Sequence, residues 1–475
     1  MHNVIASELF SEFIEHQPAL KSIRKGLELT GFSEPVYLVG GAPRDLLLGQ
    51  TPGKDLDLVS TGDVLTLAEK LWELRIADEP PVLYKNFGTT MLRIDDFHLE
   101  LIRARKESYR VGSRKPETEP ASIEEDALRR DFTVNTLLVD IRTAKLNDPL
   151  GLGLRDFGKR TLRTPREPEL TFEEDPLRML RGVRFRSQIG FKYAPGLPEA
   201  MQAKAETLET LSAERIQEEF VKMLRLPNPS PALNDLLDFG LLAVFAPELA
   251  RMKGTEQGHY HHLDVWDHTL LVVSLVPAEN LTLRLAALLH DIGKPDTYQM
   301  DAEGRIRFLQ HELVGEKIAR DLLNRLKFPH RQVDTVCKLV RGHMRLGSAP
   351  VFTDTAARRL IRDMGDDLGD LFDLVEADTK ALKPGVKPMD IRPIREQVEK
   401  IQSELGDQKI ASPLDGTEIQ ELFNLSGKQI GEAKRYLEEQ LIRGALTAGD
   451  KEKARLLLAS YLERSSSGNE SNSEP

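Results

Sequence analysis

The chain of 475 residues has a single cysteine, Cys337, and no apolar run that approaches the roughly 20 residues needed to cross a membrane as a helix. One cysteine excludes a framework of internal disulfides and fits a reducing compartment, so we expect Cys337 to be an ordinary core residue. The first residues, MHNVIASELFSEFIEHQ, mix acidic with apolar side chains and lack the pattern of a leader peptide. We therefore expect a soluble, cytoplasmic protein without membrane contact.

An excess of positive charge is also absent. Lys and Arg number 65 against 76 Asp and Glu, which gives a net charge of −11. This balance excludes a surface that is basic all over, but it leaves open a nucleic-acid partner bound through a local basic face. The composition, 40% hydrophobic and 30% charged, is ordinary for a globular protein, and the length suits about three domains of roughly 150 residues.

Two apolar patterns divide the chain. An N-terminal amphipathic helix precedes short β-branched runs such as VYLVG and TTMLRI, which predict a small sheet. From Glu167 onward, apolar residues recur at helical spacing, with Pro-rich joints between segments. We predict an α/β head with a small mixed sheet, followed by an all-α neck, a helical body and a helical tail. The predicted boundaries are an N-terminal helix 1–30, head 31–165, neck 166–235, body 236–385, tail 386–463 and a disordered end 464–475.

The segment YLVGGAPRDLLLG reads as a strand, a tight turn and a helix. Gly40 and Gly41 fall where backbone N–H groups and a helix N-terminus hold phosphate oxygens, and Arg44 adds a charged fork. An ordinary turn between buried elements is the alternative. The residues downstream favour the phosphate site.

Asp55 and Asp57, in KDLDLV, alternate on a predicted strand, so both carboxylates emerge on one face ~7 Å apart along the chain. Two like charges on one face repel each other unless a cation lies between them, and this is the arrangement that holds Mg²⁺ for phosphoryl transfer. A solvated edge strand is the alternative, but the glycine pair just upstream favours metal binding. Glu100, in HLELIRA, is the candidate for a third carboxylate, although strand alternation alone also explains it.

This combination resembles the nucleotidyltransferase superfamily that includes DNA polymerase beta. Three further segments resemble the tRNA nucleotidyltransferases of the bacterial and eukaryotic class, the CCA-adding enzymes: EEDALRRDFTVNTL, FEEDPLRMLRGVRFRSQIGF and LSAERIQEEFVKML. The resemblance, in order and spacing, covers roughly residues 30 to 235. It implies template-independent addition of C, C and A to the 3′ end of tRNA from CTP and ATP, with two-metal chemistry on Mg²⁺. A poly(A) polymerase, or an enzyme that adds only CC or only A, is the alternative, because such enzymes share the head.

Asp175 and Arg178, read as positions i and i+3 of one helix, would place an acceptor beside a donor fork. Cytosine and adenine each offer an amino donor next to a ring acceptor, so one Asp/Arg pair suits both and rejects guanine and uracil. A surface salt bridge is the alternative. The resemblance implies that this pair replaces a nucleic-acid template. The other nucleotide-binding residues that it implies are Arg129, Arg130, Asp131, Asn135, Glu174, Arg181 and Arg184.

Two more features of this region bear on the RNA. Arg181, Arg184 and Arg186 extend from Arg178 as a basic strip, which is either a groove that follows the RNA backbone or a solvated helix face. The polar segment RKESYRVGSRKPETEPASIEED, residues 105–126, is long for a loop inside a domain. In the family that the chain resembles, a flexible loop here helps the switch from cytosine to adenine and is shortened in CC-adding enzymes. The segment is not shortened in this chain.

The helical body contains histidines and aspartates that are far apart in sequence but lie in apolar helical segments, where they can converge on a metal. They are His268, His290, Asp291 and Asp378. A lone core histidine is usually only hydrogen-bonded, but this order resembles the HD superfamily of metal-dependent phosphohydrolases, and His311 and His343 fall where such domains have extra ligands. The resemblance implies a divalent transition metal and phosphatase or 2′,3′-cyclic phosphodiesterase activity. The alternatives are a body that only binds RNA, and a phosphohydrolase whose head only binds nucleotides.

Overall fold

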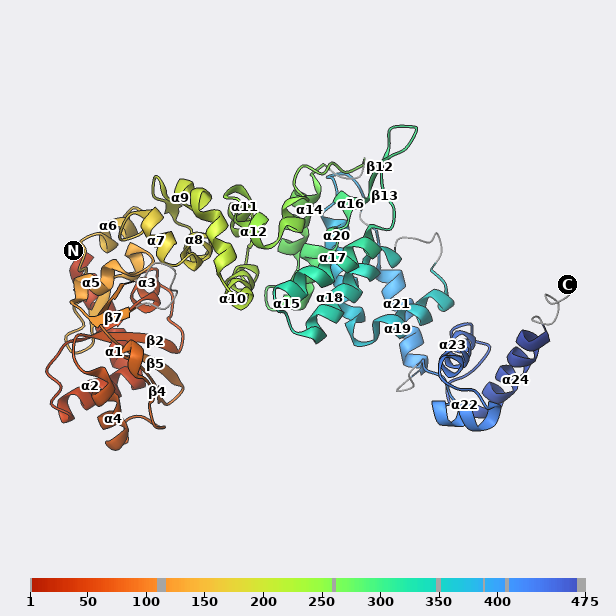
Figure 1. Cartoon of the computed structure of the whole chain (residues 1–475), viewed down its shortest axis with the longest axis horizontal. Helices are drawn as coiled ribbons and strands as arrows, with labels where there is room; N and C mark the ends of the chain where they lie inside the picture. The colour runs from red at the N-terminus through yellow and green to blue at the C-terminus, as the bar shows by residue number, and fades with distance from the viewer. Residues whose placement is uncertain are drawn as a thin grey trace. The chain divides into compact units, whose positions relative to one another are not determined.

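The structure is a computed structural model that describes residues 2–108, 117–258, 262–346, 352–387, 389–405 and 410–467. The chain divides into two compact units, Met1–Met223 with Pro231–Phe245, and Leu224–Ser230 with Ala246–Pro475. Figure 1 shows a first unit of strands and helices and a second unit that is predominantly helical. The predicted order of an α/β head followed by helical segments is confirmed, and the finer domain boundaries stay predictions.

The head is built on a mixed sheet of seven strands in the order β3-β4-β5-β2-β1-β8-β9. Strands β2 and β5 are parallel, and the other neighbouring pairs of this sheet are antiparallel. The strands are β1 (Val36–Val39), β2 (Asp55–Ser60), β3 (Val82–Tyr84), β4 (Thr89–Ile94), β5 (Phe97–Arg103), β8 (Leu138–Asp140) and β9 (Leu146–Asn147).

The two faces of this sheet differ in their covering. Leu56 and Leu58 of β2 lie in a core with residues of α1 (His2–His16), α2 (Pro18–Leu29) and α4 (Val64–Glu73). Because side chains alternate along a strand, Asp55 and Asp57 lie on the opposite face. The predicted N-terminal helix is interrupted at Pro18, which begins α2 because proline suits the first helical position and not the interior.

Short elements and then helices complete the first unit. The head continues through α3 (Gly41–Leu47), the ribbon β6 (Arg105–Ser108) and β7 (Glu117–Pro120), α5 (Ile123–Leu128), η2 (Thr133–Asn135) and α6 (Gly153–Gly158). The helices that follow are α7 (Pro168–Glu174), α8 (Leu177–Ile189), α9 (Leu197–Lys204), α10 (Ala213–Leu224), α11 (Ser230–Asp238) and α12 (Leu241–Phe245).

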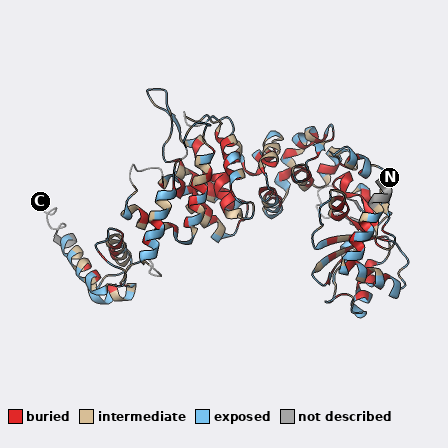
Figure 2. Ribbon diagram, turned by 180° about the vertical axis from the view of Figure 1, so that it is seen from behind, coloured by how far each residue is buried: buried red, intermediate tan, exposed pale blue. Residues whose placement is uncertain are grey.

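The second unit is a helical bundle whose buried residues gather in its interior, as Figure 2 shows in red. Its main helices are α14 (Val265–Leu275), α15 (Leu281–Leu289), α17 (His311–Arg325), α18 (His330–Gly342), α19 (Asp354–Met364), α20 (Leu368–Lys380) and α21 (Arg392–Leu405). A hairpin of β12 (Tyr298–Met300) and β13 (Ile306–Phe308) precedes α17. Cys337 is buried in α18, as expected for a core residue.

The tail has a core of its own, which includes Leu414, Leu437 and Leu458. It consists of α22 (Gly416–Phe423), α23 (Lys428–Ile442) and α24 (Lys451–Ser467). The last helix continues past residue 463, where the sequence pattern predicts the ordered chain to end, and residues 468–475 lie outside the described part. Among the described helices, none combines the length and the apolar character that a membrane span requires.

Candidate active sites

Three carboxylates lie side by side on the face of the head sheet that α1, α2 and α4 do not cover. In the parallel pairing of β2 with β5, Asp57 is opposite Glu100 and Asp55 is opposite His98. Neighbouring strands are about 4.8 Å apart, so the side chains of Asp57 and Glu100 are direct neighbours. We call Asp55, Asp57 and Glu100 the carboxylate row. The pairing that brings Glu100 beside Asp57 joins residues 43 positions apart, which local spacing does not reveal.

The carboxylates of this row repel one another unless a cation lies between them. Burial raises the pKa of Asp57, and Asp55 raises it further, although Arg130 and Arg181 oppose the shift. Burial also raises the pKa of Glu100, and the charge of Asp57 is the next largest cause. A group of oxygen ligands that repel one another is the set that a hard divalent cation stabilises. The donor set therefore fits a divalent metal.

Gly40 brings the backbone against this row. It has a φ of 78°, in the left-handed region that favours glycine, and a Cβ built on it would lie 3.0 Å from Asp57 Oδ2. Any other residue would be strained and would crowd the carboxylate. Gly41 then begins α3, so the glycine pair lies next to the row, as the sequence predicts.

Arg44 is buried, and its donors point to protein acceptors. Its Nη1 donates to Asn135 Oδ1 at 2.8 Å and its Nε to Asp45 Oδ1 at 2.8 Å, while the guanidinium lies 4.8 Å from the ring centre of Phe185. Asn135 in turn donates to Asp131 Oδ1 at 3.0 Å. The structure thus joins the glycine turn to α8 through a buried network, in which Arg44 and Asn135 hold other groups in place.

Asp131 accepts two hydrogen bonds from Arg181 on a single carboxylate oxygen. Arg181 donates to Asp131 Oδ2 from Nε at 2.9 Å and from Nη2 at 2.7 Å. Burial alone would raise the pKa of Asp131, but Arg181 and Asn135 outweigh it and hold that pKa below its usual value. The side chain of Arg181 keeps 34% of its surface exposed. Asp131 is therefore saturated by protein partners, and Arg181 is the member of this pair that solvent reaches.

Asp126 is a member of the site that the sequence reasoning missed. Its Oδ1 accepts from Arg129 Nη2 at 2.7 Å, and its Oδ2 accepts from Arg130 Nη2 at 2.8 Å. Burial would raise the pKa of this carboxyl, but Arg130 and Arg129 lower it overall. The i+3 and i+4 spacing in DALRR was the available signal. One buried carboxylate thus fixes both arginines.

The prediction that Asp175 and Arg178 share a helix is wrong. Helix α7 ends at Glu174, Asp175 is extended with φ −144° and ψ 98°, and Pro176 precedes α8. A residue before proline is pushed out of the helical region by the pyrrolidine ring, which explains the break. Asp175 therefore lies in a joint between two helices and not on a regular helix face.

The alternative, a salt bridge between Asp175 and Arg178, does not occur in the structure either. Asp175 accepts from Arg215 Nη2 of α10 at 3.2 Å through both oxygens. Arg178 is buried, donates to the carbonyl of Arg129 at 2.6 Å and lies 3.5 Å from Glu174. Arg215 is a second residue that the sequence reasoning missed, because its partner is 40 positions away.

The basic strip predicted on α8 is wrong for Arg178 and Arg184, because both are buried. Arg184 donates from Nε to Glu219 Oε2 of α10 at 2.6 Å. A buried arginine is tolerated when a carboxylate pairs with it, and here the acid comes from another helix. These arginines instead make contacts that join α8 to neighbouring elements. Among Arg178, Arg181 and Arg184, Arg181 is the most exposed.

In the second unit, the predicted histidines and aspartates converge. His268 Nε2 lies 2.9 Å from Asp378 Oδ1, and His290 Nε2 lies 3.7 Å from the same oxygen and 3.1 Å from Asp291 Oδ2. These residues come from α14, α20 and the end of α15. His268, His290 and Asp378 offer ligand atoms within 4.8 Å of one another.

A second group adjoins the first through Asp291. Its Oδ1 lies 3.4 Å from His311 Nε2 and 3.9 Å from His343 Nε2, while its Oδ2 lies 3.1 Å from His290 Nε2. Asp291, His311 and His343 also offer ligand atoms within 4.8 Å. The two oxygens of one carboxylate therefore face two groups of histidines. We call these six residues the HD cluster.

The backbone orients three of these rings. The Nδ1 atoms of His290, His311 and His343 lie 2.8, 2.9 and 2.6 Å from the carbonyls of Ala287, Phe308 and Val340. A carbonyl only accepts, so the Nδ1 atom of each ring carries a proton, and Nε2 is the ring atom that is left to face the cluster.

The contact between His311 and His343 is the strongest sign of a cation. Their Nε2 atoms lie 3.2 Å apart, which places two lone pairs against each other unless a proton or a metal joins them. Burial, and then the charge of His290, lower the pKa of His343 to about 3, so a proton on this ring is disfavoured at neutral pH. The donor set of imidazoles and carboxylates fits a divalent transition metal. Lys294, which the sequence reasoning missed, lies 2.7 Å from Asp291 Oδ2.

Three known domain families match successive parts of the chain. The chain matches "Poly A polymerase head domain" over residues 36–163, "Probable RNA and SrmB- binding site of polymerase A" over 190–253, and "HD domain" over 259–409. A solved structure of a Bacillus stearothermophilus CCA-adding enzyme in complex with CTP aligns with a TM-score of 0.66 at 24% identity, covering 95% of this chain and 100% of that one. At this identity the match shows the fold.

Curated relatives with higher sequence identity show the family to which the chain belongs. A CC-adding tRNA nucleotidyltransferase of Thermus thermophilus is 37% identical over 440 residues, 89% of this chain and 92% of the relative. An A-adding tRNA nucleotidyltransferase of Deinococcus radiodurans is 34% identical, over 72% of this chain and 80% of the relative. A multifunctional CCA protein of Xanthomonas campestris is 33% identical, over 69% and 79%. The chain therefore belongs to the tRNA nucleotidyltransferase family, with a poly(A) polymerase-type head and an HD domain.

Proposed function

We propose that this enzyme adds C, C and A to the 3′ end of tRNA, using CTP and ATP, and that Asp55, Asp57 and Glu100 hold Mg²⁺ for the transfer. Both domain types imply dependence on divalent metals. The observation that carries the proposal is the carboxylate row, with Asp57 opposite Glu100 and Gly40 against Asp57. Mg²⁺ on such oxygens neutralises a triphosphate and activates an attacking hydroxyl.

The arginines near this row are assigned to the triphosphate and ribose. Asp126 holds Arg129 and Arg130, and Asp131 holds Arg181, so the cationic groups are fixed before the ligand arrives. Groups that are already oriented lose little conformational entropy when they stabilise developing charge. Gly40 and Gly41 add backbone donors at the start of α3.

Base selection is assigned to Asp175 and Arg178. Asp175 offers an acceptor for the amino group that cytosine and adenine share, and Arg178 offers donors for the ring acceptor. Arg215 grips Asp175 through both oxygens and so orients it, and Glu174 pairs with Arg178. In the structure Arg178 donates to the carbonyl of Arg129, so base pairing requires this donor to change its partner.

Addition of all three nucleotides, and not of CC or A alone, rests on the segment between β5 and α5. It is not shortened, and its described ends pair as the ribbon β6–β7, while residues 109–116 lie outside the described part. The experiment is to incubate the protein with Mg²⁺ and tRNA that lacks its 3′ end, and to size the products to one nucleotide. We expect two additions with CTP alone and three with CTP and ATP.

Other products would identify the alternatives. A stop after two nucleotides in the presence of both triphosphates indicates a CC-adding enzyme. Extension only of tRNA that already ends in CC indicates an A-adding enzyme, and a long run of A indicates a poly(A) polymerase. A cytoplasmic location stays part of the proposal and rests on the single cysteine.

We further propose that the HD cluster is a phosphohydrolase centre that removes a 3′-phosphate or a 2′,3′-cyclic phosphate from RNA before addition. The observation that favours it is Asp291, whose two oxygens face separate groups of histidines. A transition metal there would supply a Lewis acid and a reactive water. Three rings present Nε2 to the cluster because their Nδ1 atoms are committed to carbonyls.

A further inference from the structure

The carboxylate row continues, across the sheet, into a face that the described residues leave open. Across the strands, Asp57 pairs with Glu100, Glu100 with Met91, and Met91 with Val82. Paired residues point to the same face, so these four side chains form one line. Val82 is 54% exposed, although it is a large apolar residue.

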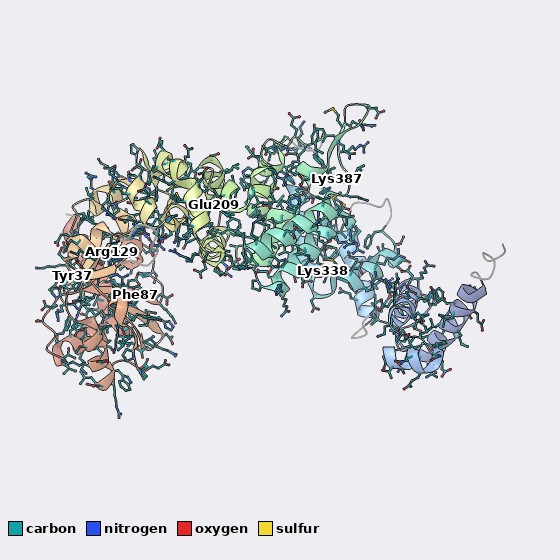
Figure 3. The ribbon with its side chains drawn as sticks, viewed as in Figure 1. Tyr37, Phe87, Arg129, Glu209, Lys338 and Lys387 are labelled. Carbon is teal, nitrogen blue, oxygen red and sulfur yellow. The ribbon has the colours of Figure 1, made fainter. Side chains whose placement is uncertain are left out.

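The next line of side chains on this face is also open at its end. Ile102 pairs with Thr89, and Thr89 pairs with Tyr84, which is 48% exposed. Phe87, which follows in the turn η1 (Lys85–Phe87) and is labelled in Figure 3, is 41% exposed. We call Val82, Tyr84, Phe87 and Met91 the aromatic platform.

Basic side chains border the aromatic platform. Lys85 is exposed beside Tyr84, and the guanidinium of Arg105 lies 5.9 Å from the ring centre of Phe87. Half-exposed aromatic rings next to cations are the combination that binds single-stranded nucleic acid, because every base has a face that stacks and every phosphate is negative.

The position of the platform follows from the direction of the reaction. The glycine turn lies on the β1 side of the row, since Gly40 contacts Asp57 and Val39 of β1 pairs with Asp57. The triphosphate is assigned to that side. In an in-line displacement the attacking and leaving oxygens lie on opposite sides of the reacting phosphorus, so the attacking 3′-hydroxyl reaches the row from the β5, β4 and β3 side.

We propose that the aromatic platform binds the terminal nucleotides of the RNA acceptor end, with Tyr84 and Phe87 as stacking residues that position the 3′-hydroxyl at the carboxylate row. This inference rests on the proposed function, because it assumes that the RNA end is the nucleophile. Tyr84 and Phe87 are positioning residues, since they contact the RNA and not the reacting atoms.

The test measures the KM for tRNA that lacks its 3′ end separately from the KM for CTP, in the wild type, Tyr84→Ala, Phe87→Ala and the double variant. Loss of one stack weakens binding by at least about fivefold, so we expect the KM for tRNA to rise by that factor while the KM for CTP stays within about twofold. Tyr84→Phe keeps the ring and should behave like the wild type. Trp72→Ala is the matched control, because Trp72 is 44% exposed on α4, which packs on the other face of the sheet.

A binding measurement without catalysis gives an independent readout. A 2-aminopurine at the last nucleotide of the tRNA should be quenched by the wild type and by Tyr84→Phe, and not by the double variant. If the double variant proves unstable, Val82→Glu takes its place. This change adds a negative charge without removing core packing, and it should also weaken binding. Unchanged quenching, or an equal rise in both KM values, overturns the platform. If the wild type adds no nucleotide at all, the proposed function fails instead.

Discussion

The two candidate active sites are assembled in different ways. The carboxylate row in the head lies on adjacent strands, with a glycine turn against it and an open face beside it. The HD cluster is buried except for Asp378, whose side chain is 24% exposed, and it is assembled from the ends and interiors of several helices, with three of its four histidines oriented by backbone carbonyls. An open row suits two large reactants that enter and leave, whereas a cluster that is exposed only at Asp378 suits the terminal phosphate of a longer chain at a fixed metal.

We expect the largest effect on activity from substitutions in the carboxylate row. Asp57→Ala, or Asp55→Ala, should lower nucleotide addition by more than about 100-fold, because the metal that stabilises the transferred phosphate loses a ligand. The fold should survive, since removing one of several repelling charges costs little stability. Asp96→Ala, at an exposed carboxylate beside Lys54, is the control. Near-normal addition by either variant with Mg²⁺ present would refute the metal assignment.

The reciprocal change separates the two sites. His290→Ala with Asp291→Ala should abolish phosphatase and cyclic phosphodiesterase activity with Ni²⁺, Co²⁺ or Mn²⁺, and should leave nucleotide addition largely intact. Both residues are buried, so a thermal melt must accompany the assay. Bound transition metal, measured by elemental analysis, should fall in parallel. If the wild type binds no such metal and hydrolyses neither substrate, the HD cluster is only part of a scaffold.

A smaller effect is expected at the joint between α7 and α8. Asp175→Ala should relax the choice among triphosphates by about 10-fold, since a lost bidentate base contact is worth ~1–3 kcal/mol of discrimination. Arg215→Ala should do the same more weakly, because Arg215 orients Asp175. Competition between CTP and UTP measures this ratio. An equal loss of affinity for all triphosphates, with unchanged selectivity, would show that Asp175 is only structural.

Asp126→Ala should destabilise the head by about 3 kcal/mol, because it leaves Arg129 and Arg130 without their buried partner. Its KM for triphosphates should rise, since the two guanidiniums are no longer fixed. Denaturant unfolding and steady-state kinetics measure the two effects. Wild-type stability and KM together would exclude the proposed role of Asp126.

The smallest effect is a pH dependence that the same carboxyl causes. The pKa of Asp126 is lower in the folded protein than its usual value, so its contribution to stability is present above the unfolded pKa, near 4, and is lost as the pH falls through the folded pKa. Asp126→Asn should therefore flatten the acid side of the stability profile. A parallel profile in wild type and variant would show that other carboxyls cause the acid loss.

The sequence could predict the parts of the site that depend on local patterns, and not those that depend on contacts between distant residues. Asp55 and Asp57 follow the two-residue period of a strand, and Gly40 precedes a helix, so local rules suffice for both. The sequence offers Glu100 as a candidate carboxylate, but its contact with Asp57 depends on the register of two parallel strands. Glu219 pairs with Arg184 from another helix, so neither contact has a local signal. Residues far apart in sequence meet here through packing, which the spacing of residues does not encode.

Two sequence interpretations failed for identifiable reasons. Continuous helical spacing suggested one helix through Asp175 and Arg178, but Pro176 forces the residue before it into an extended conformation. The arginines of α8 look like an exposed strip because arginine is usually at the surface, yet carboxylates from other elements allow Arg184 to be buried. In the first case the proline ring prevents the local helical pattern from continuing. In the second case a carboxylate from another helix allows an arginine to be buried.

The most direct test of the central claim is single-nucleotide sizing of the products formed from tRNA without its 3′ end, with the wild type and with Asp57→Asn side by side. We predict two additions by the wild type with CTP, three with CTP and ATP, and no product with the variant, which keeps the shape of the side chain but not its charge. A wild-type stop at two nucleotides with both triphosphates present, or equal addition by the variant, would contradict it.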